Sequence, residues 1–239
     1  MGDVVRTWLF RLLFAIGSLI VVIIIPFVAL FGPRAMIPYA HGWARYHTFI
    51  ARWVMGVRAH FEGAALPPGP VLFAAKHEAM FETLELPYRL GGPAVVIKRE
   101  LSQIPLWGWA ARIYGALPVD REASAKALRA LMSDAAVFKA AGRSVIVFPE
   151  GTRMPHGERP PLRSGFAGLY RALGYPVVPI ALDSGRRWPR KGHARSGPIR
   201  VLIGEPIPPG LPRREAEERV HAAINALNDG VRTGSNAKG

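Results

Sequence analysis

Residues 144–153 read SVIVFPEGTR, a run of apolar and β-branched residues that stops in a tight turn. The segment SVIVF at 144–148 is typical of a strand that is buried on both faces. Glu150, Thr152 and Arg153 follow it at once. In α/β folds, functional side chains gather on the loops at the carboxyl ends of the strands. This stretch therefore indicates an α/β fold with a functional site after the strand.

Strand-like and helix-like segments alternate along the rest of the chain. The other strand-like runs are VLFAA at 71–75, AVVI at 94–97, PVVPIAL at 176–182 and IRVLIG at 199–204. Residues 122–141 and 213–228 each place apolar side chains on one face at helical spacing. The alternation predicts an α/β domain over 58–229, with a mixed, largely parallel sheet flanked by helices. The polar residues 230–239 are expected to form a flexible tail.

The composition narrows the class of protein. The chain has 239 residues, of which 50% are hydrophobic, so intrinsic disorder is excluded. It has no cysteine, which excludes disulfides, cysteine-ligated metal sites and a thiol nucleophile. A net charge of +14 stands beside a positive mean hydropathy of +0.15. A protein that is both basic and apolar suits the anionic surface of a membrane better than nucleic acid.

The N-terminal region 1–57 is predicted to anchor the protein to a membrane. Residues 12–31 carry no charge, and a helix of that length is about as long as a bilayer core is thick. Cleavage as a signal peptide is disfavoured because the small residues of a cleavage site are poorly placed. Pro26 leaves open whether the segment spans the membrane or turns back in it. The arginines that follow favour the cytoplasmic face for the body of the protein.

A second helix is expected over residues 36–57. Its aromatic and aliphatic residues recur at helical spacing, with Arg45 and Arg52 between them. The pattern fits both a helix at the level of the lipid headgroups and a helix packed on the domain, and the sequence leaves both open.

The loop KHEAMFE at 76–82 carries a candidate catalytic pair. A neutral histidine whose second ring nitrogen bonds a carboxylate is able to take a proton from a hydroxyl group. His77 and Glu82 meet this requirement if His77 lies in the turn before a helix and Glu82 in its first turns. A helix cap with a surface charge is the alternative. Glu78 and Glu85 are further candidates for the orienting carboxylate.

The loop after residues 144–148 offers a candidate anion site. The guanidinium of Arg153 is a rigid fork suited to a phosphate, and Gly151 lets the backbone approach a ligand closely. Glu150 and Thr152 flank these two residues. A structural ion pair between Glu150 and Arg153 is the alternative.

These loops together resemble those of the 1-acylglycerol-3-phosphate acyltransferases and related glycerolipid acyltransferases. The family's His-x4-Asp motif is matched by His77 and Glu82, with Glu in place of Asp. Its F-P-E-G-T-R-S motif is matched at 148–153, with Met154 in place of Ser. VPIAL at 178–182 is similar to its fourth motif. The second block is matched by Lys98, Glu100, Leu101, Pro105, Gly108, Gly115 and Arg121.

The resemblance implies transfer of an acyl group from acyl-CoA or acyl carrier protein to the sn-2 hydroxyl of lysophosphatidic acid, which yields phosphatidic acid. It implies no metal and no cofactor. His77 is then the general base, oriented by Glu82. Arg153 binds the acceptor phosphate, with Arg121 as second candidate; Glu150 binds glycerol or fixes Arg153. Lys98, or a backbone amide near it, is the candidate for the oxyanion hole.

Other readings remain at this point. An acyltransferase of the same fold could use another lyso-lipid acceptor, such as a lyso-ornithine lipid or a lysophospholipid. The change to Glu82 also allows a catalytically silent lipid-binding protein. The basic run RRWPRKGHAR at 186–195 is either a solvated loop or a docking site for anionic headgroups or an acidic carrier protein. The expected location is a membrane, on the cytoplasmic face of a bacterial inner membrane.

Overall fold

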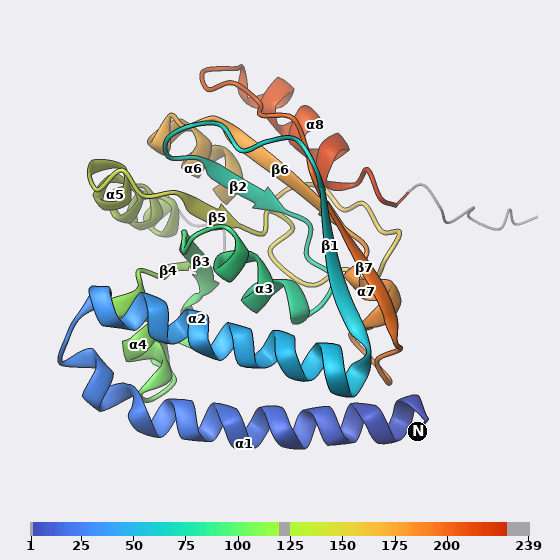
Figure 1. The fold of residues 1–239 in the computed structure, drawn as a ribbon. Coiled ribbons are helices and arrows are strands. Elements are labelled where there is room, and N and C mark those ends of the chain that lie inside the picture. The colour runs from blue at the N-terminus through green and yellow to red at the C-terminus, as the bar shows by residue number, and fades with distance from the viewer. Residues whose placement is uncertain (1, 120–124, 229–239) are drawn as a thin grey trace, which may run out of the picture.

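A seven-stranded sheet forms the centre of the molecule in the computed structural model, which describes residues 2–119 and 125–228 (Figure 1). The strands are β1 (Val57–Gly63), β2 (Leu72–Ala75), β3 (Ala94–Lys98), β4 (Leu117–Val119), β5 (Val145–Val147), β6 (Val177–Leu182) and β7 (Gly197–Ile203). Their order across the sheet is β1-β7-β6-β2-β5-β3-β4. Only β6 and β7 pair antiparallel among these strands, so the predicted mixed, largely parallel sheet is confirmed.

Helices cover both faces of the sheet. They are α1 (Asp3–Ala29), α2 (Pro33–Ile50), α3 (Phe81–Arg89), α4 (Trp107–Tyr114), α5 (Ala125–Ala140), α6 (Gly165–Leu173), α7 (Ser184–Arg187) and α8 (Arg213–Ile224). A π-helical turn, η1 (Ala51–Met55), extends α2, and a 3-10 turn, η2 (Arg99–Gln103), follows β3. The central strand β2 is buried at every residue because it has helices on both sides.

The two faces of the sheet contribute to two separate hydrophobic cores. Phe73 and Ala75 of β2 pack with residues of α1, η1 and α3. Leu72 and Ala74 point to the other side and pack with residues of α5, α6 and α8. This alternation follows from the period of two along a strand. It explains why the sequence of β2 reads as a continuous apolar run.

The strands predicted from the apolar runs are all present, although their ends shift by a few residues. The sequence did not predict β1 and β4, nor the short helices α4 and α6. Strand β1 is an edge strand with exposed polar residues, and β4 has only three residues, so neither gives a long apolar run. Helix α8 ends at Ile224, earlier than residue 228. Residues 122–124 of the helix expected at 122–141 lie outside the described residues.

The N-terminal helices lie side by side and antiparallel along one edge of the molecule (Figure 1). Helix α1 starts at Asp3, well before the uncharged run, and it continues through Pro26 to Ala29. The chain turns at Gly32, whose φ of 66° suits glycine, and α2 runs back along α1. The hydroxyls of Tyr39 and Tyr46 donate hydrogen bonds of 2.7 and 2.6 Å to carbonyls of α1.

The second helix therefore uses its aromatic residues in two ways. Trp43 donates a 3.0 Å hydrogen bond to Ser18 of α1, and His47 is fully buried. Trp53 and Phe49, in contrast, are 64% and 59% exposed. Packing on the rest of the protein, one of the two alternatives left open by the sequence, is thus found for Trp43 and His47, and the position of Trp53 and Phe49 at lipid headgroups stays a prediction.

One side of α1 is covered by exposed apolar side chains. We call this the apolar face of α1; it consists of Val4, Val5, Trp8, Leu9, Leu12, Ile16, Leu19, Ile20, Ile23, Ile24 and Phe27, all exposed. The helix is long and apolar enough to cross a membrane, and only 6% of its most apolar window is buried.

Candidate active site

His77 and Glu82 meet at the carboxyl end of β2, where the chain leaves the sheet and enters α3. The Nδ1 atom of His77 lies 2.9 Å from Oε1 of Glu82. His77 is in the turn and Glu82 in the first turn of α3, the arrangement that the spacing required. The imidazole also packs against the ring of Phe148, with centroids 4.4 Å apart and an interplanar angle of 31°. The histidine ring is thereby held from two sides.

Glu82 is oriented by several donors. Its Oε1 accepts backbone N–H bonds from Glu78 at 2.7 Å and Ala79 at 2.6 Å. Its Oε2 accepts a 2.9 Å bond from the hydroxyl of Ser184, in α7. A side chain that accepts from so many donors is a carboxylate, so the proton on Nδ1 belongs to His77. The Nε2 atom of His77 is then the basic nitrogen.

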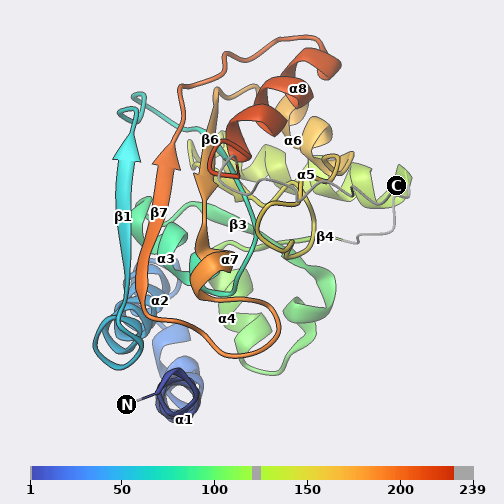
Figure 2. The ribbon, with the colours of Figure 1, turned by 90° about the vertical axis from the view of Figure 1, so that its right-hand side faces the viewer.

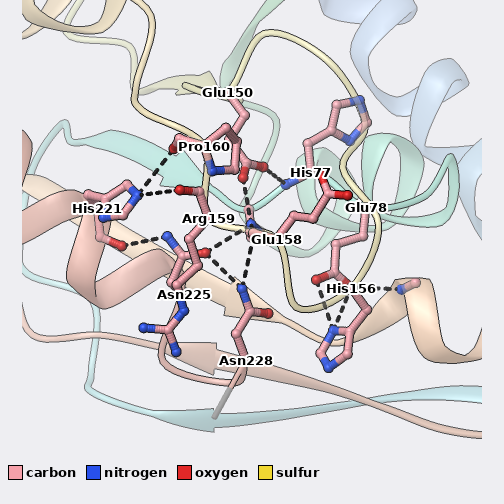
Figure 3. A network of polar contacts seen from close by, with 12 residues as sticks. His77, Glu78, Glu150, His156, Glu158, Arg159, Pro160, His221, Asn225 and Asn228 are labelled. Atoms are coloured by element: carbon pink, nitrogen blue, oxygen red, sulfur yellow. Dashed lines mark hydrogen bonds and ion pairs between the residues drawn. The ribbon is translucent and has the colours of Figure 1, made fainter. Parts of the chain in front are cut away.

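A buried lysine lies directly before the histidine. The Nζ atom of Lys76 lies 2.5 Å from Oε1 of Glu150, 2.6 Å from the carbonyl of Glu158 and 2.9 Å from Oδ1 of Asn225. We call these four residues the Lys76 cluster; Figure 3 shows its members Glu150, Glu158 and Asn225, with Asn228 beside them. Lys76 and Glu150 have no exposed side-chain surface. The cluster joins β2, the loop after β5 and the turn after α8.

This cluster gives Glu150 two partners that the sequence did not predict. Its Oε1 bonds Lys76 and its Oε2 accepts the backbone N–H of His77 at 3.0 Å. The carboxylate is therefore engaged inside the protein and holds the backbone of the catalytic loop. The alternative of a structural pair between Glu150 and Arg153 is wrong, because Lys76 takes that place.

Arg153 lies in a large apolar cavity that also contains His77. The cavity has a volume of about 1170 Å³ and extends between α1, α2, α3, α4 and the loop after β5. Among the described residues, the Arg153 guanidinium has no hydrogen-bond or ion-pair partner, so its five donors are available. Arg163 and Arg190 line the same cavity. The structure thus brings the predicted base and the predicted anion-binding residue to one space.

The remaining predicted residues lie around this cavity with different roles. Gly151 has a φ of 71°, and a Cβ there would meet Arg163 at 3.1 Å, so the loop requires glycine. Thr152 lines the cavity beside it. Lys98 also lines it, but its ammonium pairs with Glu100 at 2.6 Å. Arg121 lies outside the described residues.

The two further candidates for the orienting carboxylate have other partners. Glu78 lies 3.0 Å from Nδ1 of His156 and accepts the backbone N–H of Gly185 at 2.8 Å. Burial raises the pKa of Glu78 above its ordinary value. Glu85 bonds Thr48 of α2 and Arg89. Each of these carboxylates joins elements around the site, and the carboxylate that bonds the His77 ring is that of Glu82.

The sequence did not predict hydrogen-bond partners that are far apart along the chain. Ser184 is 102 residues from Glu82, and Asn225 is 149 residues from Lys76. No local pattern identifies such partners. The lysine itself offers one signal, because a charge directly after a buried strand requires a partner if it is buried.

Comparisons with known proteins agree with this geometry. Residues 58–183 match the family model described as Acyltransferase. The chain is 32% identical over 228 residues to a 1-acyl-sn-glycerol-3-phosphate acyltransferase of Pseudomonas aeruginosa, a match that covers 94% of this chain and 86% of that one. It is 30% identical over 162 residues to the human 1-acyl-sn-glycerol-3-phosphate acyltransferase alpha, covering 66% of this chain and 57% of the human one.

The fold is similar to that of a solved structure. The crystal structure of PlsC, the 1-acyl-sn-glycerophosphate acyltransferase of Thermotoga maritima, superimposes with a TM-score of 0.75. The match covers 98% of this chain and 100% of the other, at 19% sequence identity. This likeness extends over the sheet, its flanking helices and the N-terminal helices.

Proposed function

This chain belongs to the acyltransferase family, and on that premise we propose that it transfers an acyl chain from a thioester to the sn-2 hydroxyl of 1-acylglycerol 3-phosphate. The family predicted from the four motifs is confirmed. The observation that carries the proposed reaction is the shared cavity of about 1170 Å³, which joins the His77–Glu82 pair to Arg153. Its apolar walls suit an acyl chain, and the guanidinium of Arg153, which has no hydrogen-bond or ion-pair partner among the described residues, suits a phosphate.

The proton transfer follows from the tautomer of His77. Nε2 takes the proton of the acceptor hydroxyl as the oxygen attacks the thioester carbonyl carbon. Glu82 stabilises the imidazolium that forms, because its carboxylate lies 2.9 Å from Nδ1. When the tetrahedral intermediate collapses, the C–S bond breaks and the thiolate takes the proton from Nε2. The products are phosphatidic acid and a free thiol, and no step requires a metal ion or a redox group.

The acceptor phosphate is assigned to Arg153. The guanidinium is only partly exposed and lies in the same cavity as the base. Two parallel N–H donors match two phosphate oxygens, so the contact fixes the orientation of the glycerol as well as its charge. Lys98, at the end of β3, is in a place to stabilise the oxyanion once the substrate displaces Glu100.

The membrane is the proposed location, with α1 lying along its surface. Both halves of α1 are docked on the domain: Thr7 and Ala194 exchange hydrogen bonds, and Ile25 is buried with Met36 and Tyr114. A helix fixed along its length presents its apolar face to one leaflet and does not cross to the other. We assign this leaflet to the cytoplasmic side of a bacterial inner membrane, where thioester donors are made.

The function is tested with the purified full chain in mixed micelles of detergent and lysophosphatidic acid. Acyl-CoA and acyl carrier protein are supplied separately, and both the released thiol and the lipid product are measured. We expect phosphatidic acid and thiol in equal amounts, and no product with the folded variant His77→Ala. A preference for lysophosphatidylethanolamine or a lyso-ornithine lipid in competition would overturn the assigned acceptor. Absence of acyl transfer to every acceptor would identify a silent lipid-binding protein.

A further inference from the structure

A second group of exposed apolar side chains lies outside α1. Leu101, Ile104, Leu106 and Trp109, which we call the 101–109 patch, are 41%, 45%, 39% and 40% exposed. They come from η2, the loop after it and the first turn of α4. Four large apolar residues exposed within nine positions are unusual for a surface that only faces water.

The backbone that carries the patch is tightly built. Leu106 has a φ of +60° and a ψ of −54°, and the N–H of Trp107 bonds the carbonyl of Pro105 at 2.6 Å. This is a γ-turn of the strained kind, which a leucine adopts only at a cost. Gly108 is required, since a Cβ there would lie 2.2 Å from the carbonyl of Ser102. Arg112 donates a 2.7 Å bond to that same carbonyl.

The backbone of the 101–109 patch is therefore held in one conformation. A loop that served only as a connection would relax the strain and turn its apolar side chains inward. Here the strained turn keeps Leu106 on the outside, and the bonds around Ser102 hold the loop in that shape.

The 101–109 patch lies on the same side of the molecule as α1. Figure 1 and Figure 2 both place α4 beside α1 at the lower edge of the molecule. The contact is direct, because Tyr114 of α4 packs with Ile25 of α1 and Met36 of α2. Helix α4, which carries Trp109 of the patch, therefore packs directly on α1.

The large cavity is lined by residues of both elements. Val21, Val22 and Ile25 of α1 line it, and so do Leu101, Trp107 and Ala110 of η2 and α4. His77 lines the same cavity, so one apolar space connects these segments with the candidate base.

We propose that the 101–109 patch is a second membrane contact, which inserts into the same leaflet as α1 and forms with it the two sides of the opening for the lipid acceptor. The inference rests on the proposed function for its substrate and on the placement of α1 for its orientation. The bilayer is the occupant because α4, which carries part of the patch, packs on α1, and because the cavity that both elements line is apolar.

The natural absence of cysteine allows a site-specific test. A single cysteine is introduced at Ile104, at Ile20 in the apolar face of α1, or at Val137, and is labelled with an environment-sensitive fluorophore. Val137 is a matched control, since it is 65% exposed on α5, away from α1 (Figure 1). The labelled full chains are mixed with vesicles of phosphatidylethanolamine and phosphatidylglycerol, and quenching by aqueous iodide is measured.

We expect vesicles to shift the emission to the blue and to protect the label at both Ile104 and Ile20, but not at Val137. Protection at Ile20 alone would overturn the inference and leave the placement of α1 intact. Protection at neither position would overturn both. A response at Ile104 to acyl carrier protein without vesicles would identify a protein-docking surface and would also overturn the proposal.

A kinetic variant separates membrane contact from catalysis. Ile104 and Trp109 do not line the cavity. We expect the double variant Ile104→Ser/Trp109→Ser to lower turnover of lysophosphatidic acid in vesicles by roughly tenfold, in line with the lost apolar area. Turnover of a short-chain, water-soluble acceptor should be unchanged. Equal losses on both substrates would mean that the patch only stabilises the fold, which contradicts the proposal.

Discussion

Glu82 reaches His77 although its side chain is one methylene longer than the aspartate of the family motif that it matches. The turn at residues 78–80 accommodates the extra length, because the backbone N–H groups of Glu78 and Ala79 both point at the Glu82 carboxylate. The carboxylate thus organises the loop and orients the base at the same time. This double role makes the residue a sharp test of the mechanism.

The variant Glu82→Gln should lower kcat by at least about 100-fold, because a neutral amide does not stabilise the imidazolium. The acceptor KM should change little, since Arg153 is untouched. Steady-state kinetics on the folded variant measure both constants. Glu82→Asp is the control that keeps the charge and should retain more activity than the glutamine variant. Equal activity of Gln and Glu at this position would mean that another group orients His77.

The variant Arg153→Lys should raise the acceptor KM by about 10- to 150-fold, which corresponds to roughly 1.5–3 kcal/mol of charged hydrogen bonding. Lysine keeps the charge but lacks the planar fork. The donor KM should remain as it is. Thermal unfolding of the same preparation is the control. A lower melting temperature with an unchanged acceptor KM would show a structural arginine and refute the phosphate assignment.

The pairing of His77 with Glu82 was predictable because its geometry is local. Five positions separate His77 from Glu82, so the motif and the strand-to-helix turn are enough to place both. The partners of Lys76 were not predictable in the same way. They lie 74 and 149 residues further along the chain, and only the packing of the whole sheet brings them together. The sequence therefore predicted the pairing of His77 with Glu82 but not the bond between Glu150 and Lys76.

At the scale of elements, His47 fixes α2 between α1, α3 and the loop after α7. Its ring contacts Phe10, Phe14, Phe81 and Trp188, and neither ring nitrogen has a hydrogen-bond partner in the described chain. Burial lowers the pKa of His47 to about 4. The neutral ring is therefore part of an apolar contact that packs four elements together.

This apolar contact makes the fold sensitive to acid. The unfolded chain binds a proton at His47 below about pH 6.5, whereas the folded chain does so only near pH 4, so stability falls as the pH drops through this window. The loss amounts to about 3 kcal/mol by pH 4. Chemical unfolding at a series of pH values should show a shallower slope for His47→Leu. The control His60→Gln, at an exposed site, should behave like the parent; an unchanged slope for His47→Leu would contradict this account.

The Lys76 cluster joins three further elements, and its loss should destabilise the protein. Lys76→Met leaves the buried Glu150 unpaired, which costs about 3–5 kcal/mol. The double variant Lys76→Met/Glu150→Gln removes the stranded charge and should recover part of that loss. The free energies of unfolding of the parent, the single variant and the double variant measure the loss and the recovery. Equal stabilities of the single and double variants would show that the pair is not coupled.

The elements differ in how well the sequence predicted them. Buried strands such as β2 and β6 have continuous apolar sequences, and these sequences predicted both strands. Helix α4 was missed because it has only eight residues and follows directly on a turn. The sequence predicted a long apolar helix at 12–31 but not how it packs on the rest of the protein. Helices α2 and α4 contact α1 and fix its position, and these contacts cannot be predicted from the apolar run itself.

For the whole molecule, the net charge of +14 acts together with the apolar face of α1. Binding to phosphatidylglycerol vesicles should weaken as salt rises from about 0.1 to 1 M, because the Debye length falls from about 10 to 3 Å. A salt-resistant part should remain, since the apolar contact is not screened. Vesicle sedimentation measures both parts. Phosphatidylcholine vesicles are the neutral control; the same salt dependence on them would exclude an electrostatic contribution.

The Lys76 cluster also implies an order of events during synthesis of the chain. During synthesis α1 is made first and is able to reach the lipid surface early. The loop of His77 is then made, but Asn225, which holds it through Lys76, is added 149 residues later. At about 5–20 residues per second this interval lasts roughly 7 to 30 s. With α1 at the membrane as proposed, the growing chain thus meets the lipid before the loop of His77 gains its last partner.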